Sequence, residues 1–523
     1  MLINDSQEKI SNIDSELRLL RNQELEEEEF MKSGGFGRFQ KFANLIIIMG
    51  ILSGSQILYN LWYFQMMPIF ECKTANSLDH YHQCSRESFC NNPQIDWRID
   101  YSKEESLNNW VQQLNLFCIT QTQQGLIGSF FFLGAFLGCF FIPRLADIYG
   151  RKKPYIFGLI LYSITAIIYP FSTSLNLNYL LIFLGGISES GRYYVGFVYL
   201  QELMPKSHQT LVGLNIFLAH AFAKLFYDFY FYQITKNWIY LSYSSIAMVL
   251  ICLICMYWIP ESPKFLISSN QKQRAKQSFD QIAQINGVRN TFEEQLQTQM
   301  IHHFNEERKD GQNKADAEDT SRSQSQDIQI VEKFDQLFKK KRYLLNLLIM
   351  IFSWSTASFG FYLIPYFLSS INSKLQQNSF NVFQLGMASS VSEIFANVFC
   401  YFITGLFPNK KSLIYSYILA FLGSVGFWAA QDSVFNSSNI LYYLLFSKFG
   451  ITVAFNITYV IMGELFPTLL KATAFGICNI IARMITILSP MIALLDQPYP
   501  MLIFCNTCLI AGLLSIFLKP IIK

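Results

Sequence analysis

Several ionisable residues lie inside apolar stretches of the sequence, where charged groups are rare. His220, Lys224 and Asp228 follow one another at four-residue spacing, so a helix places all three on one face. An ionisable side chain at the centre of a lipid bilayer costs at least about 2.5–3.5 kcal/mol, so such residues usually face a cavity or pair with another charge. We therefore expect these side chains either to contact a bound solute or to neutralise one another.

The alternatives differ from residue to residue on this face. Lys224 and Asp228 can form an internal ion pair, which would leave them no role in binding. His220 can titrate near physiological pH and couple a proton to transport, or it can stay neutral in a hydrogen bond. Glu189 and Arg192, three residues apart in another apolar stretch, are also expected to pair.

Arg483 and Glu393 are buried charges of a different kind. Arg483 lies in the middle of an apolar stretch that contains no acidic residue, and Glu393 lies in a separate stretch. An arginine in a cavity can bind a carboxylate through two parallel hydrogen bonds. Alternatively, Arg483 pairs across helices with Glu393 or Asp228, and the sequence leaves both possibilities open.

These residues must be positioned by membrane-spanning helices. The 523-residue chain is 51% hydrophobic and 15% charged, whereas charge makes up about a quarter of an ordinary soluble domain. Each apolar stretch has about 18–25 residues, enough for a helix to cross a bilayer core. We therefore predict an all-α membrane protein with twelve transmembrane helices in two six-helix lobes. The stretches lie near residues 42–70, 122–142, 154–172, 178–201, 211–231, 238–259, 343–368, 381–406, 411–430, 438–462, 471–495 and 500–519.

Basic residues are concentrated in alternate loops, which the positive-inside rule assigns to the cytoplasm. Both termini are therefore expected there. The polar start of the sequence predicts a disordered cytoplasmic tail over residues 1–41 and no cleavable signal peptide. The remainder divides into an N-terminal lobe at 42–259, a cytoplasmic linker at 260–342 and a C-terminal lobe at 343–519.

A long polar loop at residues 71–121 is expected on the outer side of the membrane. Cys72, Cys84, Cys90 and Cys118 lie in or at the end of this loop, where an oxidising compartment would allow two disulfides. Their pairing cannot be read from the sequence, and four free cysteines are the alternative. Cys252 and Cys255, like Cys505 and Cys508, have the spacing of metal ligands, but both pairs lie inside apolar stretches without a second pair nearby. We therefore expect no metal site and no cofactor.

Residues 145–153, Leu-Ala-Asp-Ile-Tyr-Gly-Arg-Lys-Lys, form a short charged hairpin between two apolar stretches. Gly150 permits a tight turn. Asp147 can cap backbone amides or pair with a cation, and Arg151 and Lys152 can anchor the turn against anionic lipid. The hairpin therefore has the residues of a switchable ion-pair site, although it could also serve membrane topology alone.

The two halves of the chain contain similar motifs at corresponding positions. Gln201-Glu-Leu-Met-Pro205 ends the fourth apolar stretch and Gly463-Glu-Leu-Phe-Pro467 ends the tenth, so Glu202 and Glu464 are 262 residues apart. Adding the same offset to residues 147–151 of the first hairpin gives residues 409–413, which form a second hairpin between apolar stretches. Parallel halves of this kind are typical of two-lobed transporters with a substrate site between the lobes. We expect Glu202 and Glu464 to take part in gating with the hairpin residues.

With these features, the chain resembles the major facilitator superfamily and, within it, the organic cation/anion (carnitine) transporter family. The hairpin 145–153 is similar to the superfamily signature. The narrower resemblance is carried by Pro68-Ile-Phe-Glu-Cys72, Asn115-Leu-Phe-Cys118, Pro260-Glu-Ser-Pro-Lys-Phe-Leu266 and Glu464-Leu-Phe-Pro-Thr-Leu-Leu-Lys471. The second hairpin, Gly405-Leu-Phe-Pro-Asn-Lys-Lys, departs from the family pattern, so we expect an asymmetric pair of gates.

The resemblance implies a cavity between the lobes and assigns residues to it. Trp354 and Tyr362 lie in a helix that lines the cavity in this family, and Glu393 is implied to be a cavity-facing acid. Arg483 occupies a position that is acidic in the family's cation carriers and basic in its anion and zwitterion carriers. This favours a carboxylate-bearing solute, while Glu393 favours a cation.

We therefore expect a carrier that moves small organic ions by alternating access, and not an enzyme. Its partners would be the solute, the lipid bilayer and, as a further possibility, a co-transported ion or proton; no nucleic acid is expected. The plasma membrane is the expected location, with an internal membrane as the alternative. Two other functions remain open, a sugar porter of the same superfamily and a non-transporting, carrier-like receptor or vesicle protein.

Overall fold

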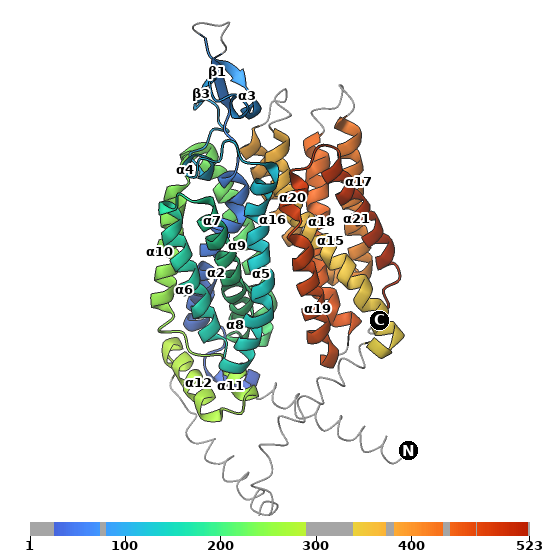
Figure 1. Cartoon of the computed structure of the whole chain (residues 1–523). Coiled ribbons are helices and arrows are strands. Elements are labelled where there is room, and N and C mark those ends of the chain that lie inside the picture. The colour runs from blue at the N-terminus through green and yellow to red at the C-terminus, as the bar shows by residue number, and fades with distance from the viewer. Residues whose placement is uncertain are drawn as a thin grey trace, which may run out of the picture.

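The computed structural model describes residues 26–73, 80–288, 338–372, 381–431, 440–466 and 468–520. These residues form two helical bundles that stand side by side, blue to green and yellow to red in Figure 1. We call residues 26–288 the N-lobe and residues 338–520 the C-lobe. A small β-sheet projects from one end of the N-lobe, and helices α11 (Pro263–Ser268) and α12 (Lys272–Asn286) lie at the other. We call these the sheet end and the hairpin end.

The N-lobe is built from long apolar helices with one irregular member. The fourth predicted stretch is divided by a π-helical turn, η2 (Ser190–Val195), between α7 (Leu175–Glu189) and α8 (Gly196–Glu202). Such π-bulges frequently occur at functional sites. The other long helices are α2 (Arg38–Phe64), α5 (Gln121–Tyr149), α6 (Lys152–Ile168), α9 (Gln209–Phe229) with its π-helical end η4 (Tyr230–Ile234), and α10 (Ile239–Cys255). The short helices α3 (Arg86–Cys90) and α4 (Trp110–Gln113) lie between α2 and α5.

The C-lobe follows the same plan with fewer interruptions. Asn381 caps the start of α16, where its side chain accepts a hydrogen bond from the Phe383 amide at 3.2 Å. Proline 365 lies inside α15, the long helix that faces the N-lobe. The helices are α15 (Lys341–Asn372), α16 (Val382–Leu406), α17 (Asn409–Gln431), α18 (Ile440–Leu465), α19 (Thr468–Thr486), α20 (Ser489–Ala493) and α21 (Tyr499–Ser515).

Nine helices in the described ranges are long and apolar enough to cross a membrane. The shorter apolar helices α10 and α21, of 17 residues each, coincide with two further predicted stretches, and the divided α7–η2–α8 segment coincides with another. A helical bundle is therefore confirmed, while the count of twelve spans stays a prediction. Large apolar side chains such as Phe141, Phe171 and Phe402 are exposed on the outside, as expected where lipid covers the bundle.

The loop predicted at 71–121 is a small folded unit. Strand β1 (Phe70–Lys73) pairs antiparallel with β2 (His82–Cys84) on one side and β3 (Asp96–Ile99) on the other. Two disulfides, Cys72–Cys84 and Cys90–Cys118, hold it together. Its core is aromatic, with the rings of Phe89 and Trp97 stacked at 4.4 Å. The prediction of two disulfides is confirmed, and the structure supplies their pairing.

The predicted tail is ordered in its last part. Residues 26–32 are helical, and the Phe30 ring is buried against Phe279 of α12 at 5.1 Å. Asn286, at the end of α12, accepts a hydrogen bond from the Phe39 amide at 2.8 Å and donates one to the Ser33 carbonyl at 2.7 Å. The expectation of disorder up to residue 41 is wrong for residues 26–41 because their apolar side chains pack on the N-lobe. Residues 1–25 lie outside the described ranges.

The described parts of the predicted linker are helical. Residues 260–288 contain α11 and α12, and residues 338–340 lead into α15. Residues 289–337 and 432–439 lie outside the described ranges.

Candidate functional site

A cavity lies between the two lobes and contains about 620 Å³ of space not occupied by protein atoms. Four ionisable side chains line it: Glu189, His220, Glu393 and Arg483. Its aromatic lining comprises Tyr59, Phe131, Phe132, Tyr193, Tyr194, Phe217, Phe361, Tyr362 and Phe455.

The structure gathers only part of the predicted site at this cavity. Lys224 and Asp228 line a second, smaller cavity of about 250 Å³ nearer the sheet end, together with Trp62 and Tyr63. Trp354 is absent from both linings; it is buried in the C-lobe, with its ring 4.7 Å from Tyr459. Trp354 therefore packs between helices in this conformation, and its assignment to the binding site stays a prediction.

Arg483 on α19 lies in the cavity without an acidic partner. No carboxylate of the described residues forms an ion pair with it, so the alternative of a pair with Glu393 or Asp228 is not seen in this conformation. Its guanidinium lies 5.0 Å from the Tyr194 ring centroid, and the hydroxyl groups of Tyr362 and Tyr459 interact with it. The side chain is 4% exposed, and its Nε has no hydrogen-bond partner.

Glu393 on α16 lies between two lysines from different lobes. Its Oε2 is 3.5 Å from the Lys224 Nζ of the N-lobe and 3.1 Å from the Lys448 Nζ of the C-lobe. All three side chains are buried, so the two lysines together overcompensate one carboxylate. The apolar setting of Lys448 in the sequence gave no indication of this partner, because Glu393 is remote in the chain.

Asp228 does not pair with Lys224 as the i, i+4 spacing suggested. Its carboxylate instead accepts hydrogen bonds from the Tyr63 hydroxyl and the Ser390 hydroxyl, each at 2.7 Å. The Lys224 ammonium instead lies 3.5 Å from the Glu393 carboxylate and 3.5 Å from the Ser389 hydroxyl. Helical spacing predicts only neighbours on the same helix, whereas buried charged side chains also form ion pairs with residues on facing helices.

The expected pair of Glu189 and Arg192 is present, at 2.7 Å and fully inside the N-lobe. The guanidinium also lies over the Tyr162 ring, 4.3 Å from its centroid, and donates to the Ile51 carbonyl at 3.3 Å. It occupies the space beside Gly54 of α2, where any Cβ would overlap it. Glu189 is therefore already neutralised although it lines the cavity.

The buried charges do not balance. Among the described residues the buried basic side chains are Arg192, Lys224, Lys448 and Arg483, and the buried acidic ones are Glu189, Asp228 and Glu393. Three of the bases lie near an acid, which leaves the Arg483 charge in excess at the cavity. A buried unpaired charge is costly, so this site is suited to a ligand that carries a negative charge.

His220 on α9 is the fourth ionisable group of the cavity. Its Nδ1 lies 3.1 Å from the Ser55 hydroxyl of α2, and its ring makes edge contacts with Tyr59 at 5.6 Å and Tyr193 at 5.2 Å. The other ring nitrogen, Nε2, has no hydrogen-bond partner.

The lobes are held together mainly on the sheet side of the cavity. The hydrogen bonds that cross between lobes within the described ranges join Ser129 to Ile487, Tyr232 to Gln384, Asp228 to Ser390, Lys224 to Ser389 and Glu393, and Phe217 to Asn397. α9 begins and α16 ends at the hairpin end. Their segments nearest that end, beyond Phe217 and Asn397, carry none of these bonds.

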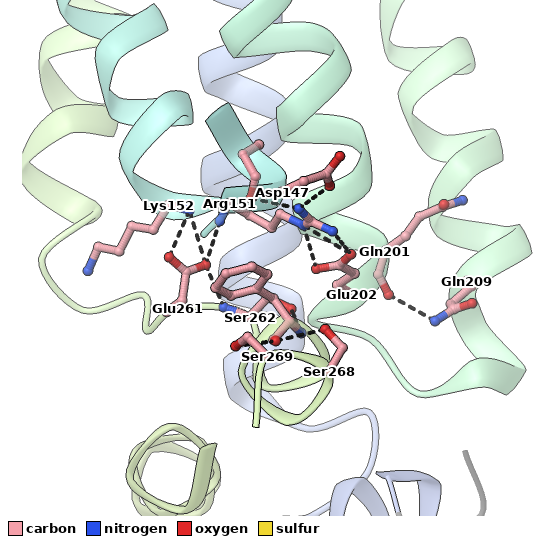
Figure 2. A network of polar contacts seen from close by, with 12 residues as sticks. Asp147, Arg151, Lys152, Gln201, Glu202, Gln209, Glu261, Ser262, Ser268 and Ser269 are labelled. Carbon is pink, nitrogen blue, oxygen red and sulfur yellow. Dashed lines mark hydrogen bonds and ion pairs between the residues drawn. The ribbon is translucent and has the colours of Figure 1, made fainter. Parts of the chain in front are cut away.

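At the hairpin end, Arg151 is the centre of a polar network shown in Figure 2. Its guanidinium forms ion pairs with Asp147 at 2.7 Å and Glu202 at 3.1 Å, and it donates to the Ala146 carbonyl at 2.7 Å. The contacts join α5, α6 and α8, all of the N-lobe. The predicted gating residues of this lobe are thus in contact with one another, and in this conformation none of these bonds reaches the C-lobe.

Glu261, which was not among the predicted gating residues, completes this network. Its carboxylate accepts hydrogen bonds from the Arg151 amide at 2.8 Å and the Lys152 amide at 3.1 Å, so it caps the start of α6 (Figure 2). Gly150 has φ +98°, and a Cβ there would overlap the Glu261 carboxylate. The Pro-Glu-Ser-Pro motif was the available signal for this residue. Lys152 contributes its backbone amide to the network.

The C-lobe has a weaker counterpart. Asn409, at the position that the 262-residue offset relates to Asp147, donates a hydrogen bond to the Glu464 carboxylate at 2.6 Å. Among the described residues no arginine takes part in this contact, and the second hairpin has Asn-Lys-Lys at 409–411. The N-lobe network is ionic and the C-lobe contact is a single amide–carboxylate bond, so the two hairpins differ in strength.

Comparisons with known proteins agree with this architecture. The Organic cation/carnitine transporter 2 of Homo sapiens is 23% identical over 425 residues, which cover 80% of this chain and 70% of that protein. The Organic cation transporter 1 of Caenorhabditis elegans is 24% identical over 460 residues, 86% of this chain and 72% of that protein. The inward-open structure of the xylose transporter XylE from E. coli has a TM-score of 0.61 at 14% identity and covers 92% of this chain and 96% of its own.

The family model of the Major Facilitator Superfamily matches residues 101–490, which include the hairpin, the cavity residues from Glu189 to Arg483 and the Glu464 segment. The relatives named above are transporters and not enzymes. The apolar helices with lipid-compatible surfaces identify an integral, multi-pass membrane protein. The resemblance read from the hairpin motif is thereby confirmed, and the chain belongs to the Major Facilitator Superfamily.

Proposed function

We propose that this protein carries small organic ions across the membrane by alternating access, and that it prefers solutes with a carboxylate, either anions or zwitterions. The observation that carries this proposal is Arg483, a buried arginine in the inter-lobe cavity without an acidic partner. A carboxylate can accept two hydrogen bonds from a guanidinium and neutralise it. The relatives named as organic cation/carnitine transporters support an organic ion as the solute.

The cavity also suits the organic part of such a solute. Aromatic rings from both lobes line it, and they can pack on a flat ring or contact a quaternary ammonium group. Glu393 lines the cavity as well, but its two lysine partners already compensate it. A purely cationic solute would therefore have no free carboxylate to bind, and this is why we place a carboxylate on the solute.

A sugar porter is the alternative within the superfamily. The similar xylose transporter supports it, as does a pair of hydrogen-bonded amides in the cavity, Asn397 and Asn456, at 2.7 Å. A neutral sugar would leave the Arg483 charge unpaired, which makes this alternative the weaker one. A carrier-like receptor without turnover is the remaining alternative, and transport assays decide it.

The proposed arrangement in the membrane has twelve spans, both termini and the hairpin end in the cytoplasm, and the sheet end outside the cell. The disulfides of the sheet unit support this orientation because disulfides persist in oxidising compartments, as do the lysines and arginines of the hairpins. We place the protein in the plasma membrane. The inter-lobe hydrogen bonds on the sheet side support an arrangement that is closed toward the outside.

We assign gating to the network of Asp147, Gly150, Arg151, Lys152 and Glu202 and to the weaker contact at Glu464. Within this arrangement the network holds α5, α6 and α8 as one rigid unit that can dock on the C-lobe when the hairpin end closes. A co-transported ion or proton would complete the cycle of a secondary active carrier, and His220 and Glu393 are the titratable groups placed to respond to it.

Uptake into proteoliposomes tests the proposal. The purified protein is reconstituted and offered radiolabelled organic carboxylates, zwitterions, quaternary amines and hexoses. Arg483→Gln should lower uptake of carboxylate-bearing solutes by at least tenfold, since about 1.5–3 kcal/mol is lost with a hydrogen bond to a charged group. Arg144→Gln, the same substitution at an exposed arginine of α5, is the matched control and should leave uptake unchanged. Uptake of hexoses alone would refute the organic-ion proposal.

A further inference from the structure

His220 is held in a fixed orientation at the wall of the cavity. The side chain is 5% exposed, and the imidazole packs edge-on against the rings of Tyr59 and Tyr193. One nitrogen, Nδ1, is engaged by the Ser55 hydroxyl behind it. The other, Nε2, is buried without a hydrogen-bond partner, on a residue that lines the same cavity as Arg483.

The partner of Nδ1 determines which nitrogen carries the proton. In a neutral imidazole one nitrogen donates and the other accepts. The Ser55 hydroxyl has no other hydrogen-bond partner within the described ranges, so it satisfies its own proton only if it donates to Nδ1. Nδ1 is then the acceptor and Nε2 carries the hydrogen. His220 therefore presents an N–H donor without an acceptor at the cavity.

We propose that the Nε2–H of His220 binds a second hydrogen-bond acceptor of the transported solute, such as an oxo, ether or hydroxyl oxygen. This inference rests on the proposed function, because it takes the carboxylate of that solute to be bound by Arg483. The selected solutes are organic acids with an oxygen acceptor in addition to the carboxylate. An acid of the same length without that oxygen leaves the buried donor unpaired.

The surrounding groups leave this donor for a ligand. Both carboxylates that line the cavity are engaged elsewhere, Glu189 with Arg192 and Glu393 with Lys448. Arg483 and His220 come from different lobes, on α19 and α9. A solute held by both donors would therefore bridge the lobes, as expected of the substrate in an alternating-access carrier. Burial makes the unmade hydrogen bond costly, which turns the donor into a determinant of selectivity.

The test compares matched acids that differ by one acceptor oxygen. Isothermal titration calorimetry on the purified protein measures Kd for 4-oxopentanoate, 5-oxohexanoate and 6-oxoheptanoate and for pentanoate, hexanoate and heptanoate. An oxo group accepts but cannot donate, so it reports on the Nε2–H alone. At the chain length that fits, the wild type should bind the oxo acid roughly 3- to 10-fold more tightly than its parent, as expected for one hydrogen bond.

Three variants separate the role of His220 from a structural one. His220→Leu should abolish the preference for the oxo acid, and His220→Gln, which can place an amide N–H near the Nε2 position, should retain part of it. Ser55→Ala leaves the ring in place but removes the donor that fixes its tautomer, so the preference should fall at least about twofold. Arg483→Gln should weaken both members of every pair to the same extent and leave their ratio unchanged.

The outcomes distinguish this inference from the proposed function. If the wild type binds none of the six acids, the carboxylate site at Arg483 is refuted, and this inference with it. If it binds the acids but prefers no oxo acid at any length, only the role of His220 is refuted. The same holds if the preference survives in His220→Leu or, should that variant fail to fold, is unchanged in Ser55→Ala.

Discussion

Replacing Glu393 by glutamine removes the carboxylate from a buried cluster of charges and leaves two lysines behind. In the wild type, Lys448 lies 3.1 Å and Lys224 lies 3.5 Å from this carboxylate, and all three side chains are buried. Glutamine has nearly the same shape, so packing is preserved and the change is electrostatic. We expect Glu393→Gln to be strongly destabilising because two buried ammonium groups lose their common partner.

The magnitude follows from buried ion pairs in general. Removing one partner of such a pair costs about 3–5 kcal/mol. The entropy of unfolding is about 2.1 cal/mol/K per residue, so it amounts to roughly 1 kcal/mol/K for a chain of this length, and Tm should fall by about 3–5 °C. The double variant Glu393→Gln/Lys448→Met removes one charge of each sign, and it should recover at least half of this loss. Lys224 can then turn to Asp228, four residues along the same helix.

Thermal unfolding of the purified protein in detergent, followed by intrinsic tryptophan fluorescence, measures these shifts. Lys448→Met alone is the matched control, since Glu393 keeps Lys224 as a partner and the loss should be smaller than in Glu393→Gln. The proposed electrostatic role of Glu393 is refuted if Glu393→Gln leaves Tm unchanged. It is equally refuted if the double variant is less stable than either single variant, because the charges would then not compensate one another.

Three other predictions concern the ends of the molecule. Gly150→Ala should lower Tm more than Gly287→Ala, because both glycines have positive φ but only the new Cβ at position 150 meets a neighbour, Glu261. An equal decrease of Tm in the two variants would show that the overlap with Glu261 contributes nothing and that the positive φ alone is destabilising. Peptide mapping without reduction should recover Cys72 linked to Cys84 and Cys90 linked to Cys118, and any crossed pair would contradict the sheet unit. Burial raises the pKa of the Glu26 carboxyl, opposed in part by Lys264, so docking of residues 26–32 is favoured below that pKa and weakens as pH rises through it. Hydrogen exchange corrected for intrinsic rates should show more protection of this segment at pH 5 than at pH 7, and the reverse order would exclude this role of Glu26.

Hydropathy and charge placement predicted most of the helical framework, because a bilayer requires long apolar helices and leaves them a clear signal. The π-helical turn at 190–195 and the sheet unit at 70–99 were not predicted. A π-turn keeps the same apolar composition as an α-helix, so nothing in hydropathy reveals it. The strands of the sheet unit are only three or four residues long. Strands this short would not form a stable sheet alone, and the two disulfides stabilise it.

Three of the ionisable residues predicted for the binding site line the cavity, and the sequence did not predict their partners. Arg483, Glu393 and His220 stood out because a charge in an apolar stretch is rare, and all three line the cavity. Their partners depend on which helices face one another, and this is tertiary information. Helical spacing paired Glu189 with Arg192 correctly, but it failed for Lys224, whose closest acid lies on α16.

The contact between Gly54 and Arg192 has a consequence for reading natural variation in this protein. The guanidinium fills the place that a side chain at position 54 would take, so the two positions share one volume. A homologue with alanine or a larger residue at position 54 should carry a shorter, uncharged residue at position 192, and it would then have to release Glu189 from its pair. Positions 54 and 192 should therefore covary, and a change at the glycine alone would displace the guanidinium and leave the Glu189 carboxylate unpaired at the cavity.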